Sequence, residues 1–232
     1  EGTPEAKVAG GLLSNGLHAR IMMPDGREFW IQPLPAGLQG ATALHHVVYE
    51  RSQILRTSQS CGADLLANNH SVPVPQLGPG GAAPLGSTLY TAELGCDADF
   101  EFYQRNGNSV QATIDDIERI MNRVDTIYVR DVDVTIQLTG IVVRTTSADP
   151  YSTSDAGQLL DQFRNHWNQN FSGIRRDLAH LFTGRNVNGG TIGIAYLGVV
   201  CSQTFGYGLS ESRFTNNLVN RTGLTAHEMG HN

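Results

Sequence analysis

The sequence is short of cysteine and of charge. Three cysteines in 232 residues are too few for a disulfide scaffold, and their odd number leaves open one bridge plus a free thiol, or partners beyond Asn232. Charged residues make up 16% of the chain against 40% hydrophobic residues, which excludes a disordered chain and indicates a buried core. The formal net charge of -6 argues against nucleic acid or an anionic membrane as the main partner.

Long apolar segments are also missing. The longest, residues 192–201, is interrupted by glycines and suits a buried strand, so we expect no membrane span. A leader is missing too, because the chain starts at Glu1 with no charged-then-apolar segment before Gly11. The sequence ends at Asn232 inside a predicted helix. We therefore expect a fragment that has lost a signal peptide or starts within a longer chain, and that is incomplete at its C-terminal side.

Lysine and arginine are absent from residues 62–88, where proline, glycine, alanine and serine dominate. This composition predicts an extended linker at 68–88, which separates an N-terminal unit at 1–67 from a second unit at 89–232. In the N-terminal unit, strands are predicted at 19–23, 28–31 and 44–50, with a turn at 23–27.

Helices and strands alternate in the second unit. Asn108 or Ser109 can cap a helix whose apolar residues recur at helical spacing as far as Tyr128, and another helix starts after Ser154. Strands are predicted near 134–143, 180–183, 191–197 and 207–211, and a last helix near Asn217. This order predicts an α/β layered fold. We also expect Trp30 and Trp167 in the core, and Arg175-Arg176 as a solvated pair on a loop.

The last helix contains His227-Glu228-Met229-Gly230-His231, an H-E-x-x-H pattern. Histidines four residues apart lie on one helix face, so both imidazoles can reach one zinc ion. Glu228 then lies beside the metal and not on it, where it can take a proton from the attacking water and later deliver it to the leaving amine. Two interpretations compete with this one: a helix surface that carries these residues by chance, and a zinc site without activity.

Residues 225–232, Thr-Ala-His-Glu-Met-Gly-His-Asn, resemble the active-site helix of the adamalysin (reprolysin) branch of the metzincins. The resemblance implies the N-terminal subdomain of a metzincin-type catalytic domain, with a twisted mixed sheet and the active-site helix. It also places a third zinc-binding histidine and a methionine-containing turn beyond Asn232. We therefore expect the fragment alone to bind zinc weakly and to be inactive.

The resemblance extends upstream. Residues 183–196 are similar to the segment that leads into the family's upper edge strand, so Ile192, Gly193, Ile194 and Ala195 would bind substrate backbone by strand addition. Cys201 stands where the family has a cysteine bridged to one further downstream. Glu93 and Asp177 match two carboxylates that hold a structural calcium ion in some members.

The N-terminal unit resembles the end of the same family's prodomain, a small and mostly β structure. The similar segments are Phe29–Leu34 and His45–Tyr49, and Ser60-Cys61-Gly62 stands where such prodomains place an inhibitory cysteine. A Cys61 thiolate there would occupy the open zinc position. A disulfide between Cys61 and Cys96, or a free structural thiol, remains an alternative.

Together these features predict a secreted zinc metalloendopeptidase that cleaves extracellular proteins or peptides and is kept latent by its own prodomain. Because no dibasic site occurs in the linker, autocatalysis or another protease would have to release the prodomain. One alternative is a thermolysin-like zinc peptidase. The other is a catalytically silent binding module that keeps the metzincin fold, and the intact Glu228 argues against this second alternative.

Overall fold

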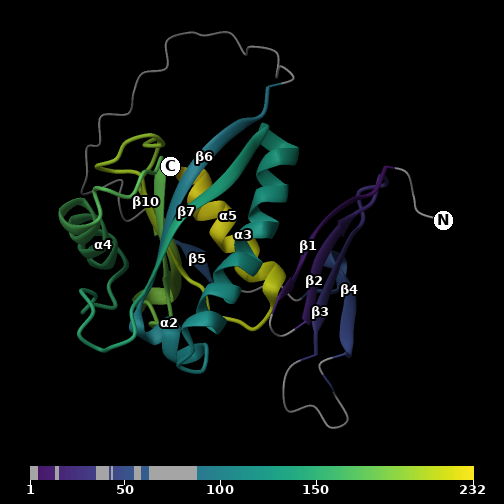
Figure 1. Cartoon of the computed structure of the whole chain (residues 1–232), viewed down its shortest axis with the longest axis horizontal. Coiled ribbons are helices and arrows are strands. Elements are labelled where there is room, and N and C mark those ends of the chain that lie inside the picture. The colour runs from purple at the N-terminus through teal and green to yellow at the C-terminus, as the bar shows by residue number, and fades with distance from the viewer. Residues whose placement is uncertain (1–4, 14–15, 35–41, 43, 55–58, 63–87) are drawn as a thin grey trace.

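The computed structural model describes residues 5–13, 16–34, 42, 44–54, 59–62 and 88–232. Apart from Thr88, the predicted linker at 68–88 lies outside the described residues. The described residues form two β-sheets with helices packed against the larger one (Figure 1). None of the helices within these ranges is both long enough and apolar enough to cross a membrane.

The smaller sheet is an antiparallel meander of four strands in chain order: β1 (Lys7–Leu13), β2 (Gly16–Met22), β3 (Glu28–Pro33) and β4 (His46–Glu50). The predicted turn is present, since the Met23 N–H donates to the Arg27 carbonyl over 2.9 Å and Gly26 has a φ of 84°. The sequence did not predict β1, whose glycine-rich segment packs against the long helix of the second unit.

The larger sheet is mixed and has the order β5-β9-β10-β8-β6-β7. Its strands are β5 (Ser60–Cys61), β6 (Tyr90–Ala98), β7 (Val134–Val143), β8 (Leu178–Thr183), β9 (Thr191–Ala195) and β10 (Tyr207–Glu211). β6 pairs in parallel with β7 and β8, and β8 pairs in parallel with β10. β9 is antiparallel to β10, and β5 lies parallel to β9 on its other side. The mixed sheet confirms the predicted fold class.

In the part of the chain that the structure describes, four α-helices follow the signals that the sequence carries at their starts. They are α2 (Phe100–Arg105), α3 (Val110–Val132), α4 (Ala156–Asn170) and α5 (Leu218–His231). Ser109, Asp155 and Asn217 cap α3, α4 and α5 by accepting backbone N–H hydrogen bonds. The six-residue helix α2, capped by Asp99, was not predicted.

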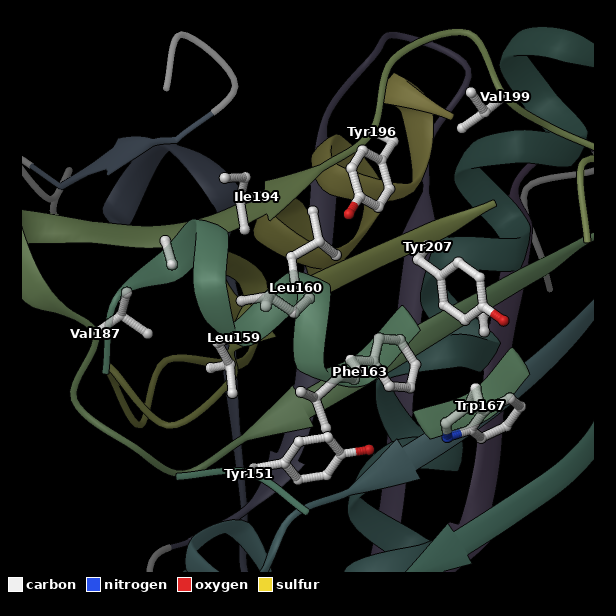
Figure 2. Close-up of a cluster of buried hydrophobic side chains, with 14 residues drawn as sticks. Tyr151, Leu159, Leu160, Phe163, Trp167, Val187, Ile194, Tyr196, Val199 and Tyr207 are labelled. Atoms are coloured by element: carbon white, nitrogen blue, oxygen red, sulfur yellow. The ribbon is translucent and has the colours of Figure 1, made fainter. Parts of the chain in front are cut away.

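Two apolar cores lie on opposite faces of the larger sheet, as the alternation along β8 shows. Ala179 and Leu181 belong to the core beneath α4, which Trp167 anchors (Figure 2). Leu178 and Phe182 point the other way, into the core shared with α3 and α5. α5 is thereby held between the sheet and α3.

Arg176 corrects one expectation. Whereas Arg175 is exposed, Arg176 is buried, and its guanidinium donates to the Phe171 and Ile174 carbonyls and to the Tyr207 hydroxyl. It therefore helps close the core beneath α4 and is not part of a solvated pair.

Trp30, on β3, joins the smaller sheet to α3. Its ring is buried in the core shared by α3 and α5, and the guanidinium carbons of Arg20 and Arg123 each lie 5.5 Å from the ring centroid. Glu28 accepts hydrogen bonds from Arg20 on β2, over 2.5 Å, and from Arg130 on α3, over 3.1 Å. The N-terminal unit is therefore docked on α3 by an aromatic anchor and by the ion pair between buried Glu28 and partly exposed Arg130.

Candidate metal centre and active site

The two histidines of the H-E-x-x-H pattern converge at the C-terminal end of α5. Their Nε2 atoms are 3.1 Å apart. Two imidazole nitrogens bound to one tetrahedral zinc ion lie about 3.3 Å apart, so the pair has the spacing that zinc requires. Both rings present nitrogen donors of the kind that zinc prefers.

Cys61 adds a third donor from a distant part of the chain. Its Sγ lies 3.3 Å from His231 Nε2 and 3.5 Å from Glu228 Oε2. The ligand atoms of Cys61, His227 and His231 all lie within 4.8 Å of one another, and among the described residues they form the one such group of three or more. Two imidazoles and a thiol make a donor set that suits zinc. No disulfide joins Cys61 and Cys96 in this structure, so the alternative pairing of these two cysteines is not formed.

Glu228 lies next to the two histidines but faces the sheet. It is fully buried, and burial raises the pKa of its carboxyl group to about 7, an effect that the hydrogen bond from Cys61 opposes. Burial also lowers the pKa of His231, with a further contribution from neighbouring His227. The glutamate thus lies beside the candidate ligands, and burial brings the pKa of its carboxyl group into the range that suits general acid–base catalysis.

Contacts to α3 fix the position of α5. Arg221 makes a bidentate ion pair with Asp116, over 3.0 and 2.6 Å, and both side chains are buried. Nearer the motif, the Tyr128 hydroxyl donates to the Ala226 carbonyl over 2.9 Å, and Met229 packs into the core. The sequence singled out neither Asp116 nor Arg221, because the two lie 105 positions apart and neither belongs to a local motif.

Strand β9 forms the wall above α5, and β5 covers its outer edge. Ser60 is aligned with Thr191 and Cys61 with Gly193, and the Gly62 N–H donates to the Gly193 carbonyl over 2.7 Å. Ile192, Gly193, Ile194 and Ala195, the predicted substrate-binding residues, are all buried in this arrangement. The segment around Cys61, which runs parallel to β9, therefore occupies the edge of β9 at which the sequence predicts strand addition by substrate.

A cleft of about 1060 Å³ lies beside Cys61, between the N-terminal unit and α5. Trp30, Glu28 and Arg51 line it on one side, and Ile192, Leu224 and His227 on the other. The cleft reaches His227, so the candidate metal centre borders a cavity even with β5 in place.

The predicted calcium residues are in contact: Glu93 lies within β6, and Asp177 immediately precedes β8. Asp177 Oδ2 accepts the Glu93 N–H over 2.8 Å, while Glu93 Oε2 is 2.7 Å from Arg175 Nε. The Cys201 N–H donates to the Asp177 carbonyl, and Cys201 is an exposed free thiol. The ion pair with Arg175 already balances the charge of the Glu93 carboxylate, which a calcium ion would need as a ligand. Calcium binding therefore stays a prediction.

A mixed sheet above an H-E-x-x-H helix defines a catalytic fold of the metallopeptidase type. Residues 114–232, just over half of the chain, match the family described as Metallo-peptidase family M12B Reprolysin-like. The chain therefore belongs to this family of metallopeptidases, which confirms the resemblance stated from the sequence.

Curated relatives agree with this assignment. The mouse and human proteins named Disintegrin and metalloproteinase domain-containing protein 19 are 34% and 35% identical, over 60% and 64% of this chain and 15% of each relative. Human Disintegrin and metalloproteinase domain-containing protein 33 is 25% identical over 94% of this chain and 27% of its own length. The chain thus spans less than a third of the length of these relatives.

Proposed function

We propose that this chain is the catalytic part of a zinc metalloendopeptidase, held latent by the N-terminal unit that precedes it. One observation carries the proposal: the Cys61 thiol, two histidines and a buried glutamate meet at the edge of the sheet. The substrates are proteins or peptides, and we place them outside the cell because the resemblance implies a secreted enzyme. The similarity to human Disintegrin and metalloproteinase domain-containing protein 33 covers 94% of the chain, so it extends beyond the family match into the N-terminal unit.

His227 and His231 would hold the zinc ion, and the resemblance assigns the third protein ligand to a histidine beyond Asn232. A zinc ion supplies Lewis-acid chemistry, which makes water a better nucleophile and stabilises charge that develops on the peptide carbonyl oxygen. The donor set and the 3.1 Å separation of the two Nε2 atoms support this assignment.

Glu228 would act as the general base and then as the general acid. Its carboxylate accepts a proton from the attacking water and passes it to the nitrogen of the leaving amine. Burial supports this role, since a group with a pKa near 7 can both take up and release a proton near neutral pH. The edge strand β9 would hold the substrate backbone through its free N–H and carbonyl groups once β5 has left.

Cys61 would keep the enzyme inactive in two ways. Its thiol would fill the coordination position that water needs, and its backbone would occupy the β9 edge that substrate needs. The anchor formed by Trp30 and Glu28 on α3 would keep this segment in place until the linker is cut.

Removing zinc tests the proposed chemistry. The test uses the longer protein that continues past Asn232, after removal of its N-terminal unit. A zinc chelator should abolish its cleavage of casein, and a stoichiometric amount of zinc should restore it. The measurements are the zinc content by atomic emission and the initial rate of cleavage. Cleavage that persists in metal-free protein would contradict a zinc mechanism and indicate another peptidase chemistry, whereas a zinc-loaded protein that cleaves nothing would leave the silent binding module.

Replacing Cys61 tests the proposed latency. The Cys61→Ser protein should show at least about tenfold higher peptidase activity before any processing, because serine is a much weaker zinc ligand than a thiolate. Cys96→Ser is the control, since Cys96 is buried in the core away from the histidines and its loss should not activate the precursor. A precursor with Cys61→Ser that stays as inactive as the wild type would show that β5 pairing, and not the thiol, maintains latency.

Family membership sets aside the thermolysin-like alternative. The silent binding module remains the second candidate, and the zinc experiment separates it from the peptidase.

A further inference from the structure

Gly193 lies at the centre of β9 and is enclosed on both sides. Gly193 is paired with Ser210 on β10 and with Cys61 on β5. The flanking residues Ile192 and Ile194 are β-branched and buried, as expected for an interior strand position. A glycine weakens such a strand and therefore needs a reason.

Backbone conformation does not supply that reason. Gly189 and Gly190, just before the strand, have φ values of 75° and 76°, which favour glycine. Gly193 is outside the left-handed region, so any residue could adopt its backbone angles.

The space beside its α-carbon does supply a reason. A β-carbon on Gly193 would lie 2.5 Å from Glu228 Oε1 and 2.6 Å from both Glu228 Cδ and Cγ. These three atoms are its nearest neighbours, so the glutamate side chain fills the volume that a side chain at position 193 would need. The catalytic carboxylate thus packs directly against the backbone of the strand that would bind substrate.

The glutamate has little freedom to move away. α5 is fixed to α3 by the Arg221–Asp116 ion pair and by the Tyr128 hydroxyl on the Ala226 carbonyl. On its open side the Glu228 carboxylate meets the Cys61 thiol at 3.5 Å. A methyl group at position 193 would therefore turn the carboxylate and not shift the helix.

We propose that Gly193 is a positioning residue for Glu228: its missing side chain lets the carboxylate lie against the edge strand, at a fixed distance from the peptide bound there. This inference rests on the proposed function for its catalytic consequence, but the packing between the two residues is independent of that function. Gly193 then sets the orientation of the general base as well as offering backbone groups to the substrate.

A set of variants of the full-length protein tests the packing. Gly193→Ala should lower the melting temperature by roughly 3–10 °C, because overpacking a buried site is destabilising. In a Glu228→Ala background the same change should cost less than about a third as much, since Cγ, Cδ and Oε1 are then gone. In a Glu228→Gln background the drop should persist, because glutamine has the same shape. Gly157→Ala, in α4, is the matched control and should cause no drop, because its added carbon would meet only Asp155 Oδ1 at an ordinary 3.6 Å.

Kinetics of the mature enzyme test the consequence. Gly193→Ala should lower kcat by about 10²-fold with KM changed by less than about threefold, since a misplaced base slows chemistry more than binding. The inference would be overturned if Gly193→Ala lowered the melting temperature equally in the wild-type, Glu228→Ala and Glu228→Gln proteins, or in none of them. If the stability pattern holds but Glu228→Gln keeps full activity, Gly193 positions the side chain and the proposed chemistry is what fails.

Discussion

Glu228→Gln, in the protein that continues past Asn232 and has lost its N-terminal unit, is expected to lower kcat by about 10²–10⁴-fold. The zinc content should stay at one ion per chain. Glutamine has the shape of glutamate, so it fits the same space beneath Gly193 and leaves His227 and His231 in place. It cannot accept a proton from the attacking water. The variant should therefore bind metal and substrate normally and fail at the chemical step.

The measurements are kcat and KM on a peptide substrate, zinc content, and binding of an uncleavable peptide. Glu118→Gln, which makes the same chemical change on α3, should retain wild-type kcat. Retention of more than about a third of wild-type kcat in Glu228→Gln would assign the proton transfer to another group. Loss of zinc from the variant would instead assign Glu228 a role in holding the metal centre together.

The parts of this site that a sequence can predict are those encoded locally. The i, i+4 spacing of His227 and His231 places both on one helix face whatever the rest of the fold does. Helix starts were predicted for the same reason, because caps such as Ser109 and Asn217 act on N–H groups two or three residues away. The alternation in residues 134–143 likewise predicts a strand without reference to its neighbours.

Contacts between residues far apart in the sequence could be predicted only from the family resemblance, or could not be predicted at all. Cys61 and His231 are 170 positions apart, and no periodicity relates them, so the prediction that Cys61 reaches the metal depended on the family pattern. Gly193 was predicted as a substrate-binding residue, but nothing in the segment Thr191–Ala195 indicates that Glu228 fills the space beside it. Arg176 looked solvated because a buried arginine is uncommon, and the Tyr207 hydroxyl to which it donates lies 31 positions further along the chain.

The ion pair between Asp116 and Arg221 carries the largest expected stability effect. Asp116 is buried on α3, and its carboxylate contacts Arg119, Arg213 and Arg221. Arg221 is also buried, and its guanidinium contacts the Ser212 carbonyl and hydroxyl as well. Removing the one carboxylate leaves three cationic side chains close together, one of them without access to water.

Asp116→Ala is therefore expected to destabilise the protein by about 3–5 kcal/mol, the usual cost of leaving a buried charge unpaired. The corresponding fall in melting temperature is about 6–20 °C for a domain of this size. Differential scanning calorimetry or denaturant unfolding measures it. Asp25→Ala is the matched control, since Asp25 and Arg27 form an exposed pair whose loss should leave the melting temperature nearly unchanged.

Arg221→Met distinguishes an unpaired charge from the loss of a contact. The flexible apolar side chain of methionine fills part of the arginine volume, and Asp116 keeps Arg119 and Arg213 as partners. Arg221→Met should therefore lower the free energy of unfolding clearly less than Asp116→Ala does. The variant that carries both changes should be more stable than Asp116→Ala alone. If Asp116→Ala costs no more than Asp25→Ala, the pair does not hold α5 on α3. Because α5 carries His227, Glu228 and His231, a weakened pair should also lower zinc affinity, so the same variants connect the stability of this helix to the metal centre at its end.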